Sequence, residues 1–268
     1  MSKLSKLTKA FSILIKKPYM INKVIDDESV HKEIVLNENP SLKNGFPMIN
    51  FIDVLPDFNE TIHPFSFLNG GSLVTDLALL KGLAKQKENC TYFEIGTWRG
   101  ESVANVSTEA KTCFTLNLSN DSLKKLGYND EYLNQQEFYS KDLENVTHLK
   151  GNSFDYDFST YYNKCDVVFI DGDHHYESVL NDTEIAFKLL KDEKSVIVWH
   201  DYAKNPGEIR WDILRGIYDG TPIEKREKLV CVSNTLCAMF TNTSNKVIDN
   251  NKITPTKSFK VNITATKI

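Results

Sequence analysis

The feature that most constrains the fold is a regular alternation, from about residue 90, of short apolar runs with stretches of helical character. The apolar runs are rich in β-branched and aromatic residues and are bounded by turn residues, which is typical of strands. Strands that alternate with helices predict a Rossmann-like, doubly wound α/β fold, with a mostly parallel sheet and a late antiparallel strand. The predicted strands are 91–95, 113–118, 146–149, 166–170, 195–199 and one or two between 230 and 240, and the predicted helices are 102–110, 176–190 and 208–218.

The alternation divides the chain into three parts. Residues 1–70 hold five of the eight prolines and no strand–helix pattern, so we expect a helical, loop-rich extension that covers a substrate site or makes a dimer contact. Residues 71–245 form the predicted α/β domain, with Ser72 as the expected N-cap of its first helix. Residues 246–268 are polar and are predicted to be a tail or an edge strand.

The first twenty residues predict a basic amphipathic helix. Leu4, Leu7, Phe11 and Leu14 recur at helical spacing, and five lysines surround them. Two interpretations stay open: the helix packs on its own domain or on a second subunit, or it lies on an anionic membrane surface. No apolar run approaches the roughly 20 residues that a membrane-spanning helix needs.

Composition narrows the class of partner. The formal net charge is −4 and the pI is about 5.9, so a basic surface for nucleic acid is not expected. The five cysteines are scattered and form no Cys-x-x-Cys pair. They are expected to be reduced, buried thiols of a cytoplasmic protein, and a zinc ribbon is not expected.

A glycine-containing loop follows the first predicted strand. From Glu94 to Ser102 it fits the pattern E-x-G-x-x-x-G rather than the G-x-G-x-x-G of dinucleotide-binding folds. Gly96 and Gly100 let the backbone turn tightly and approach a ligand, and the helix that follows offers free N–H groups. The alternative is a tight strand-to-helix turn without a ligand.

Polar residues also end the second and third predicted strands. Asn117 lies 23 residues after Glu94, and Asn152 and Ser153 follow the third strand. Ligands of such sheets bind outside the carboxyl ends of the strands, so these residues are candidate ligand contacts. The alternative is that they serve only as turn residues.

The densest polar group follows the fourth predicted strand. Asp171, Asp173 and His174 stand there, and His200 and Asp201 end the next strand. Buried charge costs free energy unless it is paired or binds a metal ion. Parallel neighbours lie about 4.8 Å apart, so the two groups converge if these strands are adjacent. Carboxylate and imidazole ligands suit Mg²⁺ or Mn²⁺, with Fe²⁺ or Zn²⁺ as alternatives.

Together these motifs resemble class I S-adenosylmethionine (SAM)-dependent methyltransferases, and among them a metal-assisted subgroup that includes macrocin O-methyltransferase and cephalosporin hydroxylase-like proteins. The resemblance runs from about Thr91 to Phe240 and implies SAM and a divalent metal as cofactors. It implies that Asp171, His200 and Asp201 hold the metal, and that Asp173 is the general base with His174 as its rival. The SAM contacts that it implies are Glu94, Gly96, Thr97, Gly100, Ser102, Asn117, Asn152, Ser153 and Asp171.

The chain departs from the family's pattern at Asn117 and His200, where relatives usually or often have an acid. The resemblance implies O-methylation of a hydroxyl on a sugar or a similar polyol. The alternatives are a metal-independent methyltransferase that uses Asp173, His174 or His200 as base, a hydroxylase-type activity, a metallohydrolase and a non-catalytic scaffold. The wall that selects the acceptor is expected from the extension and from residues 202–207.

Overall fold

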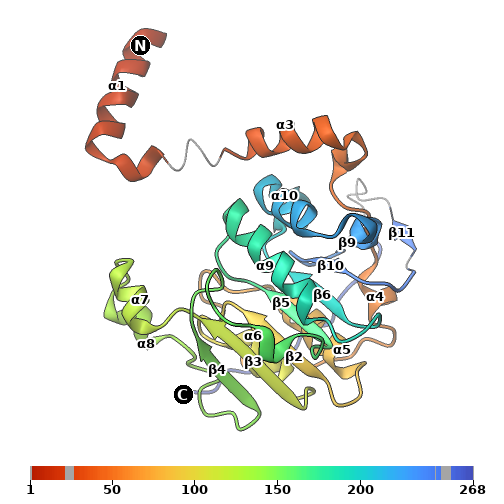
Figure 1. Cartoon of the computed structure of the whole chain (residues 1–268). Coiled ribbons are helices and arrows are strands. Elements are labelled where there is room, and N and C mark those ends of the chain that lie inside the picture. The colour runs from red at the N-terminus through yellow and green to blue at the C-terminus, as the bar shows by residue number, and fades with distance from the viewer. Residues whose placement is uncertain (1, 22–26, 245, 249–254, 268) are drawn as a thin grey trace.

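The computed structural model describes residues 2–21, 27–244, 246–248 and 255–267. Within this part of the chain a nine-stranded sheet forms the centre, in the order β11-β1-β9-β10-β6-β5-β2-β3-β4 (Figure 1). Its strands are β1 (Met48–Ile49), β2 (Thr91–Ile95), β3 (Thr112–Asn117), β4 (Val146–Lys150), β5 (Val167–Ile170), β6 (Val196–Trp199), β9 (Leu229–Val232), β10 (Ala238–Phe240) and β11 (Val247–Ile248). A separate hairpin pairs β7 (Ala203–Asn205) with β8 (Glu208–Ile209).

The sheet confirms the predicted fold class. Five neighbouring strands, β4, β3, β2, β5 and β6, are parallel. Strand β10 runs antiparallel between β6 and β9. In chain order the parallel strands stand 3-2-1-4-5, which is the doubly wound arrangement. Every residue of β5 and β6 is buried, as expected for central strands that are covered on both faces.

Helices cover the sheet on both faces and give the molecule two cores. Successive side chains of a strand point to opposite faces, so Val168 and Ile170 belong to one core while Val167 and Phe169 belong to the other. The first core packs against α3 (Glu28–Glu38), α9 (Tyr176–Leu189) and α10 (Trp211–Gly220). The second packs against α4 (Phe51–Val54), α5 (Val74–Lys85) and α6 (Glu101–Val106).

Three local predictions are wrong. The helix expected at 208–218 begins only at Trp211, because Glu208 and Ile209 pair with β7 as strand β8. Helix α5 has Leu73 rather than Ser72 as its N-cap, because the Asp76 carboxylate accepts a hydrogen bond from the Leu73 N–H. Helix α6 ends at Val106 instead of continuing to residue 110, because the Asn145 side-chain amide donates hydrogen bonds to the carbonyl oxygens of Ser107 and Ala110.

The N-terminal extension contributes to the sheet. Strand β1 pairs in parallel with β9, and β11 from the C-terminal segment pairs antiparallel with β1 as an edge strand. The Phe46 N–H donates to the buried Tyr202 hydroxyl, which ties the extension to the loop after β6. The 3₁₀ helix η2 (Pro40–Asn44) precedes this strand and contacts α3, which in turn packs on α10. The division of the chain at residue 70 stays a prediction.

Helix α1 (Lys3–Lys16) and the 3₁₀ helix η1 (Pro18–Ile21) stand apart from the sheet and its helices (Figure 1). No residue of α1 is buried. Across the described residues, no helix combines the length and apolarity needed to cross a membrane. All five cysteines are buried and unbridged, as the sequence predicts.

Candidate active site

A cavity of about 580 Å³ lies at the carboxyl edge of the sheet, where the chain order reverses between β2 and β5. Such a switch point is where ligands bind in doubly wound sheets, and the volume is in the range of small-molecule sites. The residues that line the cavity and were predicted as ligand contacts are Gly96, Thr97, Asn117, Asn152, Ser153, Asp171, Asp173 and His174.

Gly96 permits the close approach of two strand ends. Its φ is +100°, and a Cβ on it would lie 2.1 Å from the Asp171 carbonyl oxygen. Gly100 also has a positive φ, but its missing Cβ makes room for Ser140. Gly100 therefore allows the loop to pack against Ser140 and is not among the residues that line the cavity.

Glu94 and Ser102 lie beneath the loop rather than in the cavity. Glu94 is fully buried and accepts hydrogen bonds from the Tyr92 hydroxyl at 2.6 Å and the Thr115 hydroxyl at 3.3 Å. Burial raises the pKa of Glu94 to about 8, although hydrogen bonds from Tyr92, Ser102 and Thr115 act in the opposite direction. Glu94 is thus a mostly protonated support of the loop at neutral pH.

Asn117 and Asn152 face the cavity but are already hydrogen-bonded to the protein. The Asn117 amide donates to Gln136, and its oxygen accepts from the Leu118 N–H. The Asn152 oxygen accepts from the Phe154 N–H. Both therefore have the turn role that was the alternative, and both also reach the cavity.

An aromatic wall that sequence reasoning missed closes one side of the cavity. Trp98 stacks on Tyr132, with ring centroids 5.8 Å apart, and Tyr132 stacks on Tyr128 at 4.4 Å. The tyrosines come from α8 (Asp130–Asn134) and the turn before it. The buried Trp98 indole N–H has no hydrogen-bond partner, so it remains available to a ligand.

Asp182 was also missed. It lies on α9, is only 2% exposed, and lines the cavity beneath Gly172. Burial raises the pKa of Asp182 to about 6, against the hydrogen bonds from Ser153 and Asn181. The available signal was an acid on the same helical face as Val179 and Ala186, which the 3.6-residue period places toward the core.

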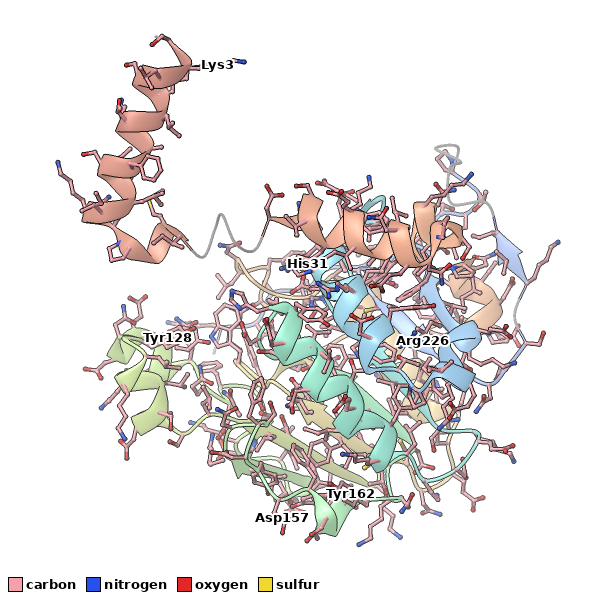
Figure 2. All side chains as sticks on the ribbon, turned by 45° about the horizontal axis from the view of Figure 1, so that its top comes forward. Lys3, His31, Tyr128, Asp157, Tyr162 and Arg226 are labelled. Atoms are coloured by element: carbon pink, nitrogen blue, oxygen red, sulfur yellow. The ribbon has the colours of Figure 1, made fainter. Side chains whose placement is uncertain are left out.

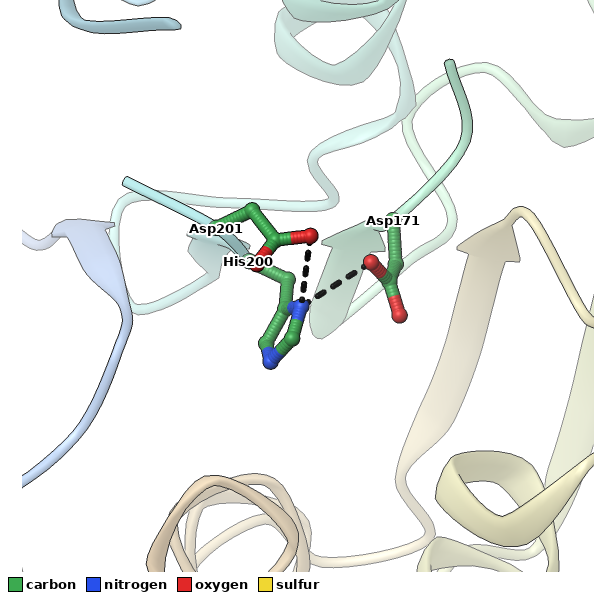
Figure 3. Close-up of side chains that lie close together, drawn as sticks. All are labelled: Asp171, His200 and Asp201. Carbon is green, nitrogen blue, oxygen red and sulfur yellow. Dashed lines mark ion pairs between the residues drawn. The ribbon is translucent and has the colours of Figure 1, made fainter. Parts of the chain in front are cut away.

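The predicted metal ligands meet because β5 and β6 are neighbours, with Ile170 in register with Trp199. Asp171 follows β5, and His200 and Asp201 follow β6 (Figure 3). The His200 Nδ1 lies 3.0 Å from Asp171 Oδ1 and 3.4 Å from Asp201 Oδ2. The donor atoms of all three side chains lie within 4.8 Å of one another.

The other side of the His200 ring tests whether this group suits a cation. Its Nε2 lies 3.1 Å from Asp76 Oδ2, and the same buried Asp76 carboxylate accepts from the Leu73 and Leu236 N–H groups. When the proton is on Nε2, the lone pair is on Nδ1, and the groups that this Nδ1 faces are the carboxylates of Asp171 and Asp201. A carboxylate behind a histidine whose other nitrogen faces two carboxylates is the arrangement of a metal ligand. The residues fit a divalent cation with oxygen and nitrogen ligands.

In the absence of a cation, the carboxylates of the group are ion-paired with the histidines. Burial lowers the pKa of His200, but the carboxylates of Asp171, Asp201 and Asp76 outweigh it and hold the pKa well above the usual range. Burial raises the pKa of Asp201, but His174 and His200 outweigh it and lower the pKa overall.

The two candidate bases stand at the edge of the cavity. Both carboxylate oxygens of Asp173 are engaged, one by His175 Nδ1 and one by the Ser178 hydroxyl, each at 2.7 Å. Burial raises the pKa of Asp173, but these hydrogen bonds lower it overall. The His174 Nε2 lies 3.0 Å from Asp201 Oδ2; burial lowers the pKa of His174, but the carboxylates of Asp201 and Asp171 raise it overall.

A second cavity, of about 470 Å³, lies at the same edge of the sheet beyond β6. Ala238 is in register with Trp199 and with Cys231, so the residues at its floor, Cys237 and Val232, lie one and two strands away from His200. The extension and the loop after β6 both contribute to the lining of this cavity, while their expected role in selecting an acceptor stays a prediction. The cavity-lining residues of these two segments are Glu28, Ser29, Lys32, Lys43, Asn44, Met48, Tyr202, Ala203, Pro206 and Gly207.

Residues 93–202 match the family described as "Methyltransferase domain". This stretch begins in β2, ends just after Asp201, and contains all the residues that line the first cavity together with the Asp171, His200 and Asp201 group.

The chain is also similar to an uncharacterized protein of Acanthamoeba polyphaga mimivirus, with 30% identity over 139 residues, which are 50% of this chain and 60% of that protein. Among solved structures it is similar to an O-methyltransferase from Bacillus cereus in complex with SAH, with 17% identity, coverage of 84% and 95% of the two chains, and a TM-score of 0.43. It is similar as well to cofactor-bound Rv0187 from MTB, with 17% identity, coverage of 66% and 84%, and a TM-score of 0.46.

Proposed function

We propose that this protein is a SAM-dependent methyltransferase that methylates a hydroxyl of a sugar or polyol-like acceptor with the help of a divalent cation. The observation that carries the proposal is the cavity at the switch point, which shares Asp171 with the group formed by His200 and Asp201. Both features lie within the stretch that matches the methyltransferase domain.

The first cavity is the proposed cofactor site. SAM, when bound, supplies a methyl group on a sulfonium, so its leaving group is already activated. Asn117 ends β3 and can donate to and accept from a ribose diol, while Asn152 and Ser153 after β4 would meet the adenine edge. Trp98 offers an unpartnered indole N–H. Gly96 keeps the backbone close enough for these contacts.

Asp171, His200 and Asp201 would hold the cation. A divalent cation there would lower the pKa of a hydroxyl bound to it and fix the direction of that hydroxyl. Asp76 holds the His200 ring in place from the opposite side. The proposed order along the sheet edge is therefore cofactor cavity, cation group, second cavity.

The hydrogen bonds favour His174 over Asp173 as the general base. Asp173 has both oxygens occupied and a lowered pKa, which makes it the weaker proton acceptor. His174 is oriented by the Asp201 carboxylate, as a base is held by a third group in many active sites. Both residues reach the first cavity.

The second cavity is the proposed acceptor site. Its lining mixes hydroxyls and amides, among them Ser29, Asn44 and Thr235, with the apolar faces of Ile209 and Trp211. Polar groups that fix hydroxyls, together with an apolar platform, suit a sugar-like body. The sugar assignment itself derives from the family resemblance.

The test is calorimetric titration of the purified protein with SAM, and separately with Mg²⁺ and Mn²⁺ after treatment with EDTA. We expect micromolar SAM binding and a cation-binding heat that disappears in Asp201→Asn. Asp142→Asn is the matched control, since it removes the same charge at an exposed position. SAM binding without any cation heat would retain a methyltransferase but remove the metal from it, and the absence of SAM binding would overturn the proposal.

A further inference from the structure

Helix α1 carries an apolar stripe that the described structure leaves exposed. At 100° per residue, Leu4, Leu7, Phe11, Leu14 and Ile15 fall within an arc of about 100°. Leu4, Phe11 and Ile15 are 71%, 59% and 81% exposed. Figure 2 shows the helix, with Lys3 labelled near its free end, standing away from the domain. An apolar stripe of this length requires an occupant.

The charge on the rest of the helix selects that occupant. Lysines flank the stripe and cover the opposite face, and no acidic residue precedes Asp26 in the sequence. The lysines are Lys3, Lys6, Lys9, Lys16 and Lys17. A surface that is apolar on one side, with lysines and no acidic residue on the other, complements the interface of a bilayer with anionic headgroups.

A second copy of the chain fits this surface less well. Two copies of α1 that share their stripes would bring two sets of lysines together, and neither helix has an acid to separate them. The helix has 14 residues, so it is about 21 Å long, too short to cross the roughly 30 Å hydrocarbon layer. It therefore suits a position in the plane of the interface.

We propose that α1 binds the surface of an anionic lipid bilayer, with Leu4, Leu7, Phe11, Leu14 and Ile15 inserted and the lysines at the headgroups. The apolar stripe supplies insertion and the lysines supply selection for negative lipids. This inference is independent of the methyltransferase proposal, because α1 contributes no residue to either cavity.

The test is co-sedimentation of the full-length protein with vesicles of phosphatidylcholine alone and with about 30% phosphatidylserine. We expect binding to the anionic vesicles at least about tenfold tighter than to the neutral ones, with release at high salt. Lys3→Glu, Lys6→Glu and Lys9→Glu together should abolish this preference. Leu7→Ser with Phe11→Ser should weaken binding while leaving the charge unchanged.

The matched control carries the same change of charge elsewhere, at Lys111, Lys125 and Lys188, which are exposed on the domain. This control should bind as the native chain does, and all variants should keep the SAM affinity of the native chain. Equal binding to both kinds of vesicle would overturn the proposal, as would binding unaffected by the α1 substitutions.

A dimer that forms without lipid and is lost in the Leu7 and Phe11 variant would assign the stripe to a second copy instead. Protection of α1 amides from hydrogen exchange without lipid, in the monomer, would assign it to the domain.

Discussion

The two halves of the sheet's carboxyl edge are built in different ways. The cofactor half takes its lining from residues 95–182, a continuous part of the chain that follows β2, β3, β4 and β5 in turn. The second half draws on residues from Glu28 to Cys237, with walls from the extension, the β7–β8 hairpin and α10. The first cavity is therefore built from consecutive strand ends, whereas the second is assembled from segments that lie far apart in the sequence. The boundary between the halves is the group of Asp171, His200 and Asp201.

The largest expected effect separates chemistry from cofactor binding at that boundary. Asp201→Asn removes a proposed cation ligand that does not line the cofactor cavity. The rate of methyl transfer should fall on the order of 10³-fold, since this substitution also removes the ion pair between Asp201 and His174. The SAM affinity, measured by calorimetry on the same preparation, should stay within about twofold. Loss of SAM binding would show that the halves are not separable.

The next prediction tests which residue beside this boundary, His174 or Asp173, is the general base. His174→Gln should lower kcat about 10²-fold, and Asp173→Asn should lower it less, because Asp173 is held by Ser178 and His175. Comparison of kcat against pH decides between them, since only loss of the base removes the acidic limb of the profile. A steeper loss in Asp173→Asn would restore Asp173 as the base.

Gly96→Ala probes the cofactor half. A Cβ with φ at +100° and 2.1 Å from the Asp171 carbonyl oxygen forces the two strand ends apart. The free energy of unfolding should fall by about 3 kcal/mol. Gly127→Ala is the control, because its φ is +93° and no atom lies within 4 Å, so only the backbone cost of about 1 kcal/mol remains. Equal losses in chemical denaturation would show that the close approach at Gly96 is not needed.

Tyr202→Phe probes the second half. The substitution leaves the Phe46 N–H without its acceptor in a buried place. The free energy of unfolding should fall by about 1–2 kcal/mol, with SAM affinity unchanged. Thermal unfolding with and without SAM measures both quantities. An unaltered melting temperature would mean that the hydrogen bond from Phe46 to Tyr202 does not hold the extension on the domain.

A further prediction concerns the dependence of stability on pH. Folding raises the pKa of Glu94 to about 8 from its ordinary value of 4.5, so the folded state binds the proton more tightly. Glu94 therefore supports the fold fully below about pH 4.5 and loses that contribution as pH rises through about 8. The slope from this single group is at most about 1.4 kcal/mol per pH unit, and Glu94→Gln should remove it. A parallel pH profile for the variant would exclude this role.

Much of the cofactor half could be predicted because its signals are local. The residues from Phe169 to His174 predict the end of a buried strand followed by polar residues. The adjacency of β5 and β6 then brings Asp171 and Asp201 together. Asp76 and Tyr132 could not be placed in the same way. Asp76 reaches His200 from 124 residues away, and Tyr132 reaches Trp98 only once the segment after β3 folds back. Their positions come from tertiary packing, which neither spacing nor periodicity records.

The pairing of β1 with β9 has a consequence for the order of folding. Met48 is in register with Cys231, so this contact waits for almost the whole chain, whereas β2 to β6 pair within residues 91–199. Closing so long a loop costs entropy that local pairings do not, and such contacts form late. During synthesis, the strands of the cofactor half emerge together before β9 exists. The second cavity is therefore the last part of the edge to be completed, and a nascent chain acquires its cofactor half before its second cavity.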